Sequence, residues 1–447
     1  MEHEGGPVKI LYLTYDGLTD PLGQSQILPY LCGLSELGYH FTVISFEKPA
    51  RFEELRNEIE LICNQYHIDW VPFIYHKFPP VFSTLLDLYR LKQQSFKLFR
   101  HNGYKIVHGR SYIPSLAGLW LKKKCGVKFL FDMRGFWADE RVEGGIWSLK
   151  NPLYRVIYRY FKKKEIEMIR EADRVITLTE NAKKEILSWD FGPETYRLFH
   201  EKISVIPSCV DTEFFDPGKI NHDHQPMLRN YLGIRENDFV LLYLGSLGTW
   251  YLLDEMLDFF QCLKDEIPGA RFLILANDID FAKKKLSNIF KPHAGKKVSE
   301  SISEKYRELI IEGRKINPAF YFKGDDFILT QCPRVLTPLY ISLASASIFF
   351  IKSSYSKKAS SATKLGESLS MGIPVITNSG WGDNEQIIMN GMEYVIRSFT
   401  RENYLSIIKN LLSNNPVKNN FKNISVLKIG SLQSGIATYM KIYRTCI

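Results

Sequence analysis

The residues best suited to chemistry lie in one run of the second half of the chain, Ser360–Pro374, which reads SSATKLGESLSMGIP. Small hydroxyl residues precede a predicted helix, for which Thr363 supplies the N-cap and Gly372 the stop. A helix N-terminus presents amide groups and a favourable dipole to an anion such as a diphosphate. We therefore predict an anion-binding site at the start of this helix.

Two charged side chains give this site its chemistry. Lys364 stands in the first turn of the helix, where the dipole disfavours a cation, and a residue that breaks a local rule in this way is often functional. Glu367 follows one turn later and could accept two hydrogen bonds from a ribose diol. The alternative is that Glu367 is an exposed residue of an ordinary helix.

A second group of polar residues follows two predicted strands of the first half. The run FDMRGFWADE places charged residues and aromatic rings directly after a buried strand, and HGRSY follows the preceding strand. Charges and aromatic rings at the carboxyl ends of strands suit sugar or phosphate binding. The alternative for each residue is a salt bridge at the surface. The predicted residues of this group are His108, Arg110, Asp132, Arg134 and Asp139.

The loop Asp16–Gln26, DGLTDPLGQSQ, joins the first predicted strand to the first predicted helix. A glycine-containing turn before a helix can hold an anion or a sugar hydroxyl, so Gly23 and Gln24 are candidates on the acceptor side. The loop contains neither GxGxxG nor a GxxxxGK[ST] phosphate loop, and a plain structural turn is the alternative.

Strands and helices alternate along both halves, which predicts two doubly wound α/β domains with parallel sheets. Ligands of such sheets bind at the carboxyl ends of the strands, and we expect these ends to face one cleft. An aperiodic segment, Val210–Asp223, is the predicted linker. The expected divisions are residues 1–209, residues 210–424, and a final helix within residues 425–447 that crosses back to the first domain.

Composition restricts the class of protein. The 447 residues exceed one ordinary core, and 45% hydrophobic with 24% charged residues is a soluble globular mixture. Seven scattered cysteines without a CxxC pair suggest neither a zinc site nor a disulfide framework, and they fit a reducing cytoplasm. No signal peptide and no membrane span are expected. The net charge of +9 favours acidic partners.

Several runs together resemble one family. TKLGESLSMGIPVITN followed by GWGDNEQII is similar to the nucleotide-sugar signature of the retaining glycosyltransferases of family 4, which have the GT-B fold. The runs DPLGQSQILPYL, ADRVITLTENAKKEI, ISVIPSCVDTEFFDP and YLGSLGTWYLLDEML agree with it in the family's order. The resemblance implies sugar transfer from a nucleoside-diphosphate donor to an acceptor hydroxyl, with retention and without a required metal.

The resemblance also assigns roles to residues. Glu367 matches the second glutamate of the family's E-x7-E motif, whereas Ala359 stands where the first would contact the donor sugar. Ser246 and Tyr251 lie near the places of an Arg and a Lys that clasp the diphosphate, so Lys357, Lys358 and Lys364 are candidate substitutes. Arg134 stands where the family often has a histidine. The predicted donor-binding set is Gly245, Ser246, Lys358, Ser361, Thr363, Lys364, Leu365 and Glu367, and Arg134 and Lys364 are the predicted catalytic residues.

The expected partners are a nucleotide-sugar donor and a glycan or lipid-linked acceptor of polysaccharide or glycolipid synthesis. Asp278–Asp280 (DID) is the nearest match to a metal-binding DxD motif, and we interpret it as a loop. Two other functions share this architecture: a sugar-nucleotide 2-epimerase, and a non-catalytic partner of another transferase, which Ala359 would permit. A nucleic-acid partner is not expected, because the basic residues form no dominant stripe.

Two helical segments mix apolar and basic residues, Phe82–Arg100 and Tyr154–Lys164. Such faces either pack on a sheet or lie on an anionic bilayer. We interpret the first segment as a helix that packs on a sheet, whereas the second segment leaves membrane contact open. We therefore expect a cytoplasmic protein that can contact the inner face of the membrane peripherally.

Overall fold

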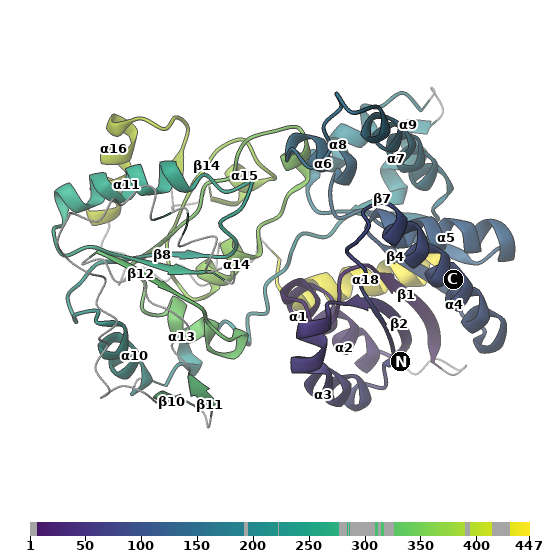
Figure 1. Ribbon diagram of the computed structural model, residues 1–447, viewed down its shortest axis with the longest axis horizontal. Coiled ribbons are helices and arrows are strands. Elements are labelled where there is room, and N and C mark those ends of the chain that lie inside the picture. Colours follow the sequence, from purple (N-terminus) through teal and green to yellow (C-terminus); the bar gives the residue numbers. More distant parts are fainter. Residues whose placement is uncertain are drawn as a thin grey trace. The chain divides into compact units, whose positions relative to one another are not determined.

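The computed structural model describes residues 7–191, 195–221, 223–276, 284, 286, 309–311, 314–316, 326–388, 394–413 and 430–447. The chain divides into two compact units (Figure 1). The first unit comprises Met1–Cys209, Ser354–Ser361 and Gly430–Ile447, and the second unit comprises Val210–Ser353 and Ala362–Ile429. None of the helices in the described residues is both long enough and apolar enough to span a bilayer.

The first unit is built on a parallel sheet of seven strands in the order β3-β2-β1-β4-β5-β6-β7. Its central strands are continuous apolar runs because helices cover both faces of the sheet. The strands are β1 (Val8–Thr14), β2 (Tyr39–Glu47), β3 (Asp69–Ile74), β4 (Ile106–Arg110), β5 (Lys128–Asp132), β6 (Arg174–Thr177) and β7 (Ile203–Val205).

Helices precede and follow these strands, as the right-handed crossovers of a parallel sheet require. The C-terminal helix belongs to this unit and packs beside α2 (Figure 1). The helices are α1 (Pro21–Gln26), α2 (Leu28–Glu36), α3 (Pro49–Gln65), α4 (Phe82–Asn102), α5 (Tyr112–Cys125), α6 (Trp137–Glu143), α7 (Pro152–Glu171), α8 (Glu180–Leu187), α9 (Thr195–Lys202), the 3-10 turn η4 (Ser356–Ala359) and α18 (Leu432–Cys446).

The short segment Ser354–Ser361 is part of the first unit because its backbone is bonded there. The Glu143 carboxylate of α6 accepts hydrogen bonds from the amides of Tyr355 and Ser356, each at 3.0 Å. The Thr179 hydroxyl donates to the carbonyl of Lys358 at 2.7 Å. This segment therefore packs with α6 and α8 rather than with the sheet of the second unit.

The second unit contains a parallel sheet of six strands in the order β12-β9-β8-β13-β14-β15. A separate antiparallel pair joins β10 and β11. The strands are β8 (Val240–Leu244), β9 (Arg271–Leu275), β10 (Leu309–Ile311), β11 (Arg314–Ile316), β12 (Phe327–Thr330), β13 (Ala346–Ile348), β14 (Val375–Asn378) and β15 (Val395–Ile396).

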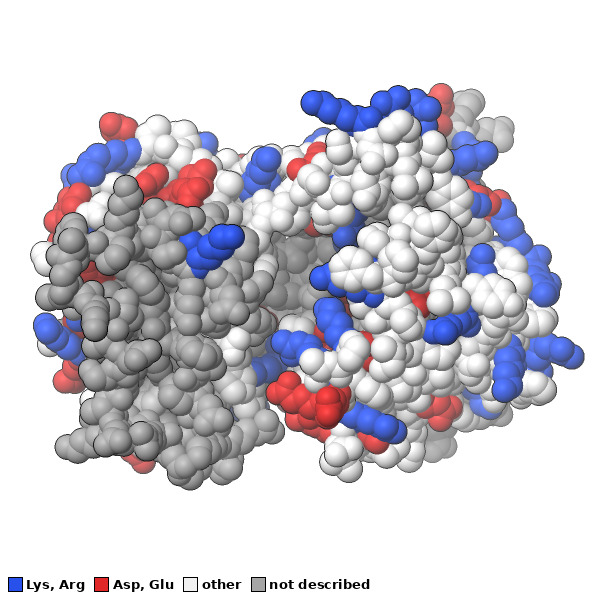
Figure 2. Space-filling model, in the orientation of Figure 1, with Lys and Arg blue, Asp and Glu red and all other residues white. Residues whose placement is uncertain are grey.

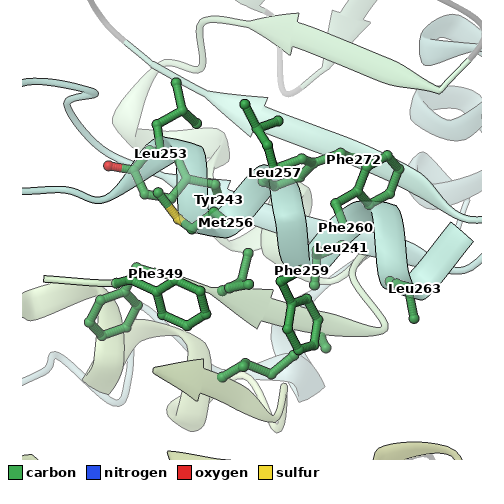
Figure 3. Packing of buried hydrophobic residues seen from close by; sticks show 14 of the residues in the cluster. Leu241, Tyr243, Leu253, Met256, Leu257, Phe259, Phe260, Leu263, Phe272 and Phe349 are labelled. Atoms are coloured by element: carbon green, nitrogen blue, oxygen red, sulfur yellow. The ribbon is translucent and has the colours of Figure 1, made fainter. Parts of the chain in front are cut away.

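One face of this sheet packs against α11, whose apolar side meets residues of β8 and β9 (Figure 3). Met256, Phe259 and Phe260 of that helix are almost fully buried. The helices and 3-10 turns of the unit are η1 (Pro217–Lys219), α10 (His224–Leu232), α11 (Leu253–Glu266), η3 (Arg334–Leu336), α13 (Thr337–Ile341), α14 (Thr363–Ser370), α15 (Asn384–Ile388) and α16 (Arg401–Ser413).

The predicted architecture of two doubly wound parallel sheets is confirmed. The prediction that Asp16–Gln26 is a loop was wrong for its second half, because Pro21 starts the short helix α1. Thr363 is the first helical residue of α14 and Ala362 is its N-cap, so the predicted side-chain cap is absent. Asp278–Asp280 lies outside the described residues.

Candidate functional site

The ammonium group of Lys364 lies in an aromatic cage in the second unit. Its Nζ is 3.8 Å from the ring centroid of Tyr251, 4.6 Å from that of Tyr243 and 5.5 Å from that of Phe349. Such contacts stabilise a cation through the negative faces of the rings. The Tyr243 hydroxyl lies 3.5 Å from Nζ, which is a weak hydrogen bond.

Burial controls the charge of Lys364, whose side chain is 6% exposed. Loss of hydration lowers the pKa of Lys364 to about 7, and the nearby charge of Glu367 offsets this effect only in part. The group is therefore poised between its charged and neutral forms at neutral pH. An anion placed beside it would favour the ammonium form.

The ammonium group faces the loop that follows β8. Gly245 has φ +124°, a conformation that favours glycine, and a Cβ at this position would lie 2.6 Å from Nζ of Lys364. The Tyr243 hydroxyl also forms a short hydrogen bond to the carbonyl of Ser246. The structure thus brings together Gly245, Ser246 and Lys364, three residues of the predicted donor site.

Glu367 lies one turn further along α14 and is also buried. Burial raises the pKa of its carboxyl group, and the charges of Arg334 and Lys364 partly oppose that rise. Arg334 Nη1 is 3.8 Å from Glu367 Oε1, and the guanidinium lies 5.2 Å from the ring centroid of Phe214. Sequence reasoning missed Arg334. The signal that could have identified it is an arginine in the run QCPRVL, shortly after β12, a strand that was not predicted.

The other predicted donor-binding residues have structural partners. Leu365 packs into the core of the second unit, and its amide donates to the carbonyl of Ala362 at 3.1 Å. Ser361 and Lys358 belong to the first unit. The Ser361 hydroxyl accepts from the amide of Ser208 at 3.0 Å, and Lys358 forms an exposed ion pair with Glu185 at 2.9 Å.

A second polar cluster is buried at the carboxyl ends of β4 and β5 in the first unit, and Asp132 is its centre. Its carboxylate lies 3.6 Å from His108 Nε2, 3.4 Å from Arg110 Nη1 and 3.8 Å from Arg134 Nη1. Tyr439 of α18 donates a hydrogen bond to the same carboxylate at 3.2 Å. The structure therefore brings together four of the predicted residues, with a contribution from the C-terminal helix that the sequence did not indicate.

Burial by itself would raise the pKa of Asp132, but Arg134, His108 and Arg110 outweigh it and lower that pKa to about 2. Burial is the largest effect on His108 and lowers its pKa, so the imidazole is neutral at pH 7. Its Nδ1 lies 2.7 Å from the hydroxyl of Tyr443. The cluster carries two guanidinium groups and the buried Asp132 carboxylate, and the partly exposed Asp16 carboxylate lies 3.7 Å from Arg110 Nε, so the charges balance.

Arg134 has a backbone φ of +57°, in the left-handed region that non-glycine residues rarely adopt. Holding such a conformation costs of order 1–3 kcal/mol, and strain of this kind gathers at functional sites. The strained backbone directs the guanidinium of Arg134 toward Asp132, at the carboxyl end of the sheet.

Asp139 is not part of this cluster. It accepts a hydrogen bond from the Tyr158 hydroxyl at 2.7 Å and forms an ion pair with Lys162 at 2.8 Å. Lys162 is also paired with the buried Glu165. Asp139 therefore ties α6 to α7, which is a structural role.

The first loop is fixed by a buried carboxylate at the end of β2, Glu47. This group accepts hydrogen bonds from the amides of Leu18 and Thr19 at 2.8 and 3.0 Å. Gly23 lies so close to the carbonyl of Gly17 that a Cβ would be 2.0 Å from it, and Gln24 donates to the Thr19 carbonyl at 2.9 Å. Gly23 and Gln24 therefore shape the turn, and Glu47 is a further residue that sequence reasoning missed.

Comparisons with known proteins agree with this architecture. The family model described as Glycosyltransferase Family 4 matches residues 30–214. No curated protein sequence matched. Similar solved structures include HepE from Anabaena in complex with UDP and glucose, at 11% identity and TM-score 0.64 over 98% of this chain and 99% of that one.

Two further structures are similar over nearly their whole length. Sucrose-phosphate synthase from Thermosynechococcus elongatus has 11% identity and TM-score 0.63, and covers 98% of each chain. WaaG, a glycosyltransferase involved in lipopolysaccharide biosynthesis, has 12% identity and TM-score 0.60, over 97% of this chain and 99% of that one. These likenesses confirm the predicted GT-B fold.

Proposed function

We propose that this chain is a family 4 glycosyltransferase that transfers a sugar from a nucleoside-diphosphate donor to an acceptor hydroxyl with retention at the anomeric carbon. The acceptor is a growing glycan or a lipid-linked glycan of polysaccharide or glycolipid synthesis. We assign the donor to the second unit and the acceptor to the first.

The caged ammonium of Lys364 is the observation that carries this proposal. Negative charge develops on the diphosphate as it leaves the sugar, and a cation already held in a water-poor site stabilises that charge strongly. Because Lys364 lies beside the Gly245 backbone, a diphosphate can approach both the ammonium and the loop amides closely. We propose that Lys364 neutralises the β-phosphate, so that no resident metal is required.

Glu367 and Arg334 complete the proposed donor site. A buried carboxylate next to the diphosphate position suits the two hydroxyls of the nucleotide ribose, each of which can donate to it. Arg334 lies beside Glu367 and over the Phe214 ring, where it can contact the nucleotide with its remaining donors. Without a nucleotide, the buried Glu367 carboxylate is only loosely paired, at 3.8 Å, with the partly exposed guanidinium of Arg334.

We propose that the polar cluster around Asp132 serves the acceptor. Arg134 and Arg110 are held at the carboxyl end of the sheet by the buried Asp132, and Arg110 also lies 3.7 Å from the partly exposed Asp16. Such a cluster suits an acceptor that carries phosphate or many hydroxyls. In a retaining reaction on one face of the sugar, the departing phosphate can take the acceptor's proton, so no separate base is assigned.

Thermal denaturation with UDP, GDP, CDP and ADP tests the donor site. A ligand that binds only the folded state raises the melting temperature, so one nucleotide should stabilise the protein at millimolar concentration. The Glu367→Ala variant should lose this stabilisation. Glu402→Ala, which removes an exposed glutamate of α16 in the same unit, is the matched control and should keep it.

The outcomes separate the proposed function from its two alternatives. Stabilisation by no nucleotide would overturn the donor site. Binding without release of nucleoside diphosphate from any nucleotide sugar would favour a non-catalytic partner. Conversion of the bound nucleotide sugar into its 2-epimer would favour an epimerase, a class that the same fold also accommodates, as in the putative UDP-N-acetylglucosamine 2-epimerase from Listeria monocytogenes.

Donor affinity should depend on pH through Lys364. The free protein has a Lys364 pKa of about 7, and a bound diphosphate raises it, so binding takes up a proton near and above that pH. Affinity for the nucleotide sugar should be greatest below pH 7 and should fall by up to about tenfold per pH unit above it. Titration calorimetry in buffers of different ionisation enthalpy measures the proton uptake. Affinity that is independent of pH between 6 and 9 would contradict the assignment.

A further inference from the structure

Large apolar side chains are exposed at the beginnings of two helices of the first unit. Phe82 of α4 is 72% exposed and Val156 of α7 is 63% exposed. Isolated exposed apolar residues are ordinary, but a cluster of large ones marks an interaction site. We call the following six residues the apolar rim: Phe78, Phe82, Leu85, Leu153, Val156 and Tyr160.

The two helices form one outer layer. Leu88 of α4 packs against the cluster that contains Ile157 and Phe161 of α7. Lys92 of α4 lies near Lys164 of α7: burial, together with that neighbouring positive charge, lowers the pKa of Lys92. Helix α5 lies beneath this layer, with most of its side chains buried. The residues of the apolar rim therefore belong to one surface rather than to two separate helix ends.

The rim lies toward the carboxyl edge of the sheet. Helix α4 follows β3 and leads into β4, and α7 leads into β6, so both helices begin at the edge where parallel strands end. The Asp132 cluster lies at the same edge, at the end of β5. A surface that the rim contacts would thus lie near the proposed acceptor side of this unit.

The exposed charged side chains of the layer near the apolar rim are basic, and the acids of α7 lie in the last third of that helix, where Glu171 is exposed. The acidic residue of α4, Asp87, is buried and bonded to His76 and Tyr15. The first thirteen residues of α7, PLYRVIYRYFKKK, contain no acid. Exposed basic residues of the layer are Arg90, Lys97, Arg100, Arg155, Arg159 and Lys163. Lys and Arg side chains also predominate along the right-hand edge of the view in Figure 2, beside α4 and α5.

We propose that this layer docks on an anionic lipid bilayer, with the apolar rim entering the interfacial region and the surrounding Lys and Arg side chains contacting lipid phosphates. Apolar contact combined with basic residues is the composition that binds such surfaces. A second copy of the chain fits poorly, because a symmetric dimer would place two positively charged layers against each other. Docking on a bilayer does not depend on the proposed glycosyltransferase function. The further conclusion that the acceptor is lipid-linked does rest on that function.

Co-sedimentation of the full chain with vesicles tests the proposal. We expect binding to phosphatidylcholine vesicles that contain phosphatidylglycerol, weak binding to pure phosphatidylcholine, and release at high ionic strength. The Phe82→Ser/Val156→Ser variant should lower the partition coefficient by roughly tenfold or more, because two large apolar groups no longer leave water. The matched control Leu37→Ser/Leu61→Ser removes exposed leucines outside the layer and should bind as the wild type does.

Equal binding by the two double variants would overturn the proposal, as would the absence of binding to anionic vesicles. Sedimentation velocity without lipid supplies a further check. Self-association that is lost only in Phe82→Ser/Val156→Ser would identify a second copy as the occupant and contradict the membrane assignment. These measurements need no nucleotide, so a failure of the donor site leaves them unaffected.

Discussion

Replacement of Lys364 by methionine is expected to make the protein more stable and almost inactive. Methionine keeps an unbranched side chain of similar length within the aromatic cage but removes a buried ammonium whose burial the nearby charge of Glu367 offsets only in part. Replacing buried charge by apolar groups is neutral or stabilises by about 1–4 kcal/mol. Loss of the cation at the diphosphate should lower kcat/KM by about 100- to 1,000-fold.

The opposite signs of the two effects make this prediction specific. Urea denaturation measures the stability and nucleotide release measures the activity. Lys409→Met removes an exposed lysine on α16 of the same unit and should change neither quantity. A Lys364→Met protein that is destabilised, or that retains wild-type kcat/KM, would show that the ammonium has a structural role and does not contact the donor.

Removal of the Asp132 carboxylate should be among the most destabilising substitutions of the first unit. Asp132→Ala removes the buried carboxylate that Arg110 and Arg134 share and leaves Arg110 only the partly exposed Asp16, and removing one partner of a buried pair typically costs about 3–5 kcal/mol. Arg134 would also lose the contact that offsets its strained backbone. We expect a large fall in the free energy of unfolding at pH 7, measured with urea.

A matched control exists in the same sheet. Asp69 lies 3.6 Å from His40, the same separation as between Asp132 and His108, but its side chain is 61% exposed. Asp69→Ala should therefore cost less than about 1 kcal/mol. Similar losses for the two variants would contradict the account of the buried cluster.

The pH dependence of Asp132 has a definite sign. The pKa of Asp132 is lowered in the folded state to about 2, below the ordinary value of an aspartate. As the pH falls, the carboxylate therefore takes up a proton in the unfolded chain before it does so in the folded protein. The stabilising contribution is present above about pH 4 and is lost as the pH falls toward 2. The difference in unfolding free energy between the wild type and Asp132→Ala should accordingly shrink over that range.

Most of the architecture could be predicted from the sequence because strand and helix periodicities are local. Runs such as VKILYLT and KFLFD are too apolar for a half-exposed strand, and they became central strands of the first sheet. Boundaries were less predictable. Pro21 began a helix within a segment interpreted as a loop, because a proline that suits a turn also suits the first position of a helix.

The candidate sites were only partly predictable. Lys364 stood out because a cation in the first turn opposes the helix dipole, and Glu367 stood out because it matches a glutamate of the family motif. The cage could not be predicted, since Tyr243, Tyr251 and Phe349 each look like ordinary core residues and are brought together only by the sheet. Tyr439 was missed for the same reason, because it reaches Asp132 from a helix more than 300 residues away, at a separation of 307.

Turnover of nucleotide sugars by the purified chain is the most direct test of the central claim. The release of nucleoside diphosphate is measured for a panel of UDP, GDP, CDP and ADP sugars, with the wild type, Glu367→Ala and the control Glu402→Ala. The account predicts release from one class of donor by the wild type and the control, and its loss in Glu367→Ala. Equal release by all three proteins, or release from no donor, would contradict it.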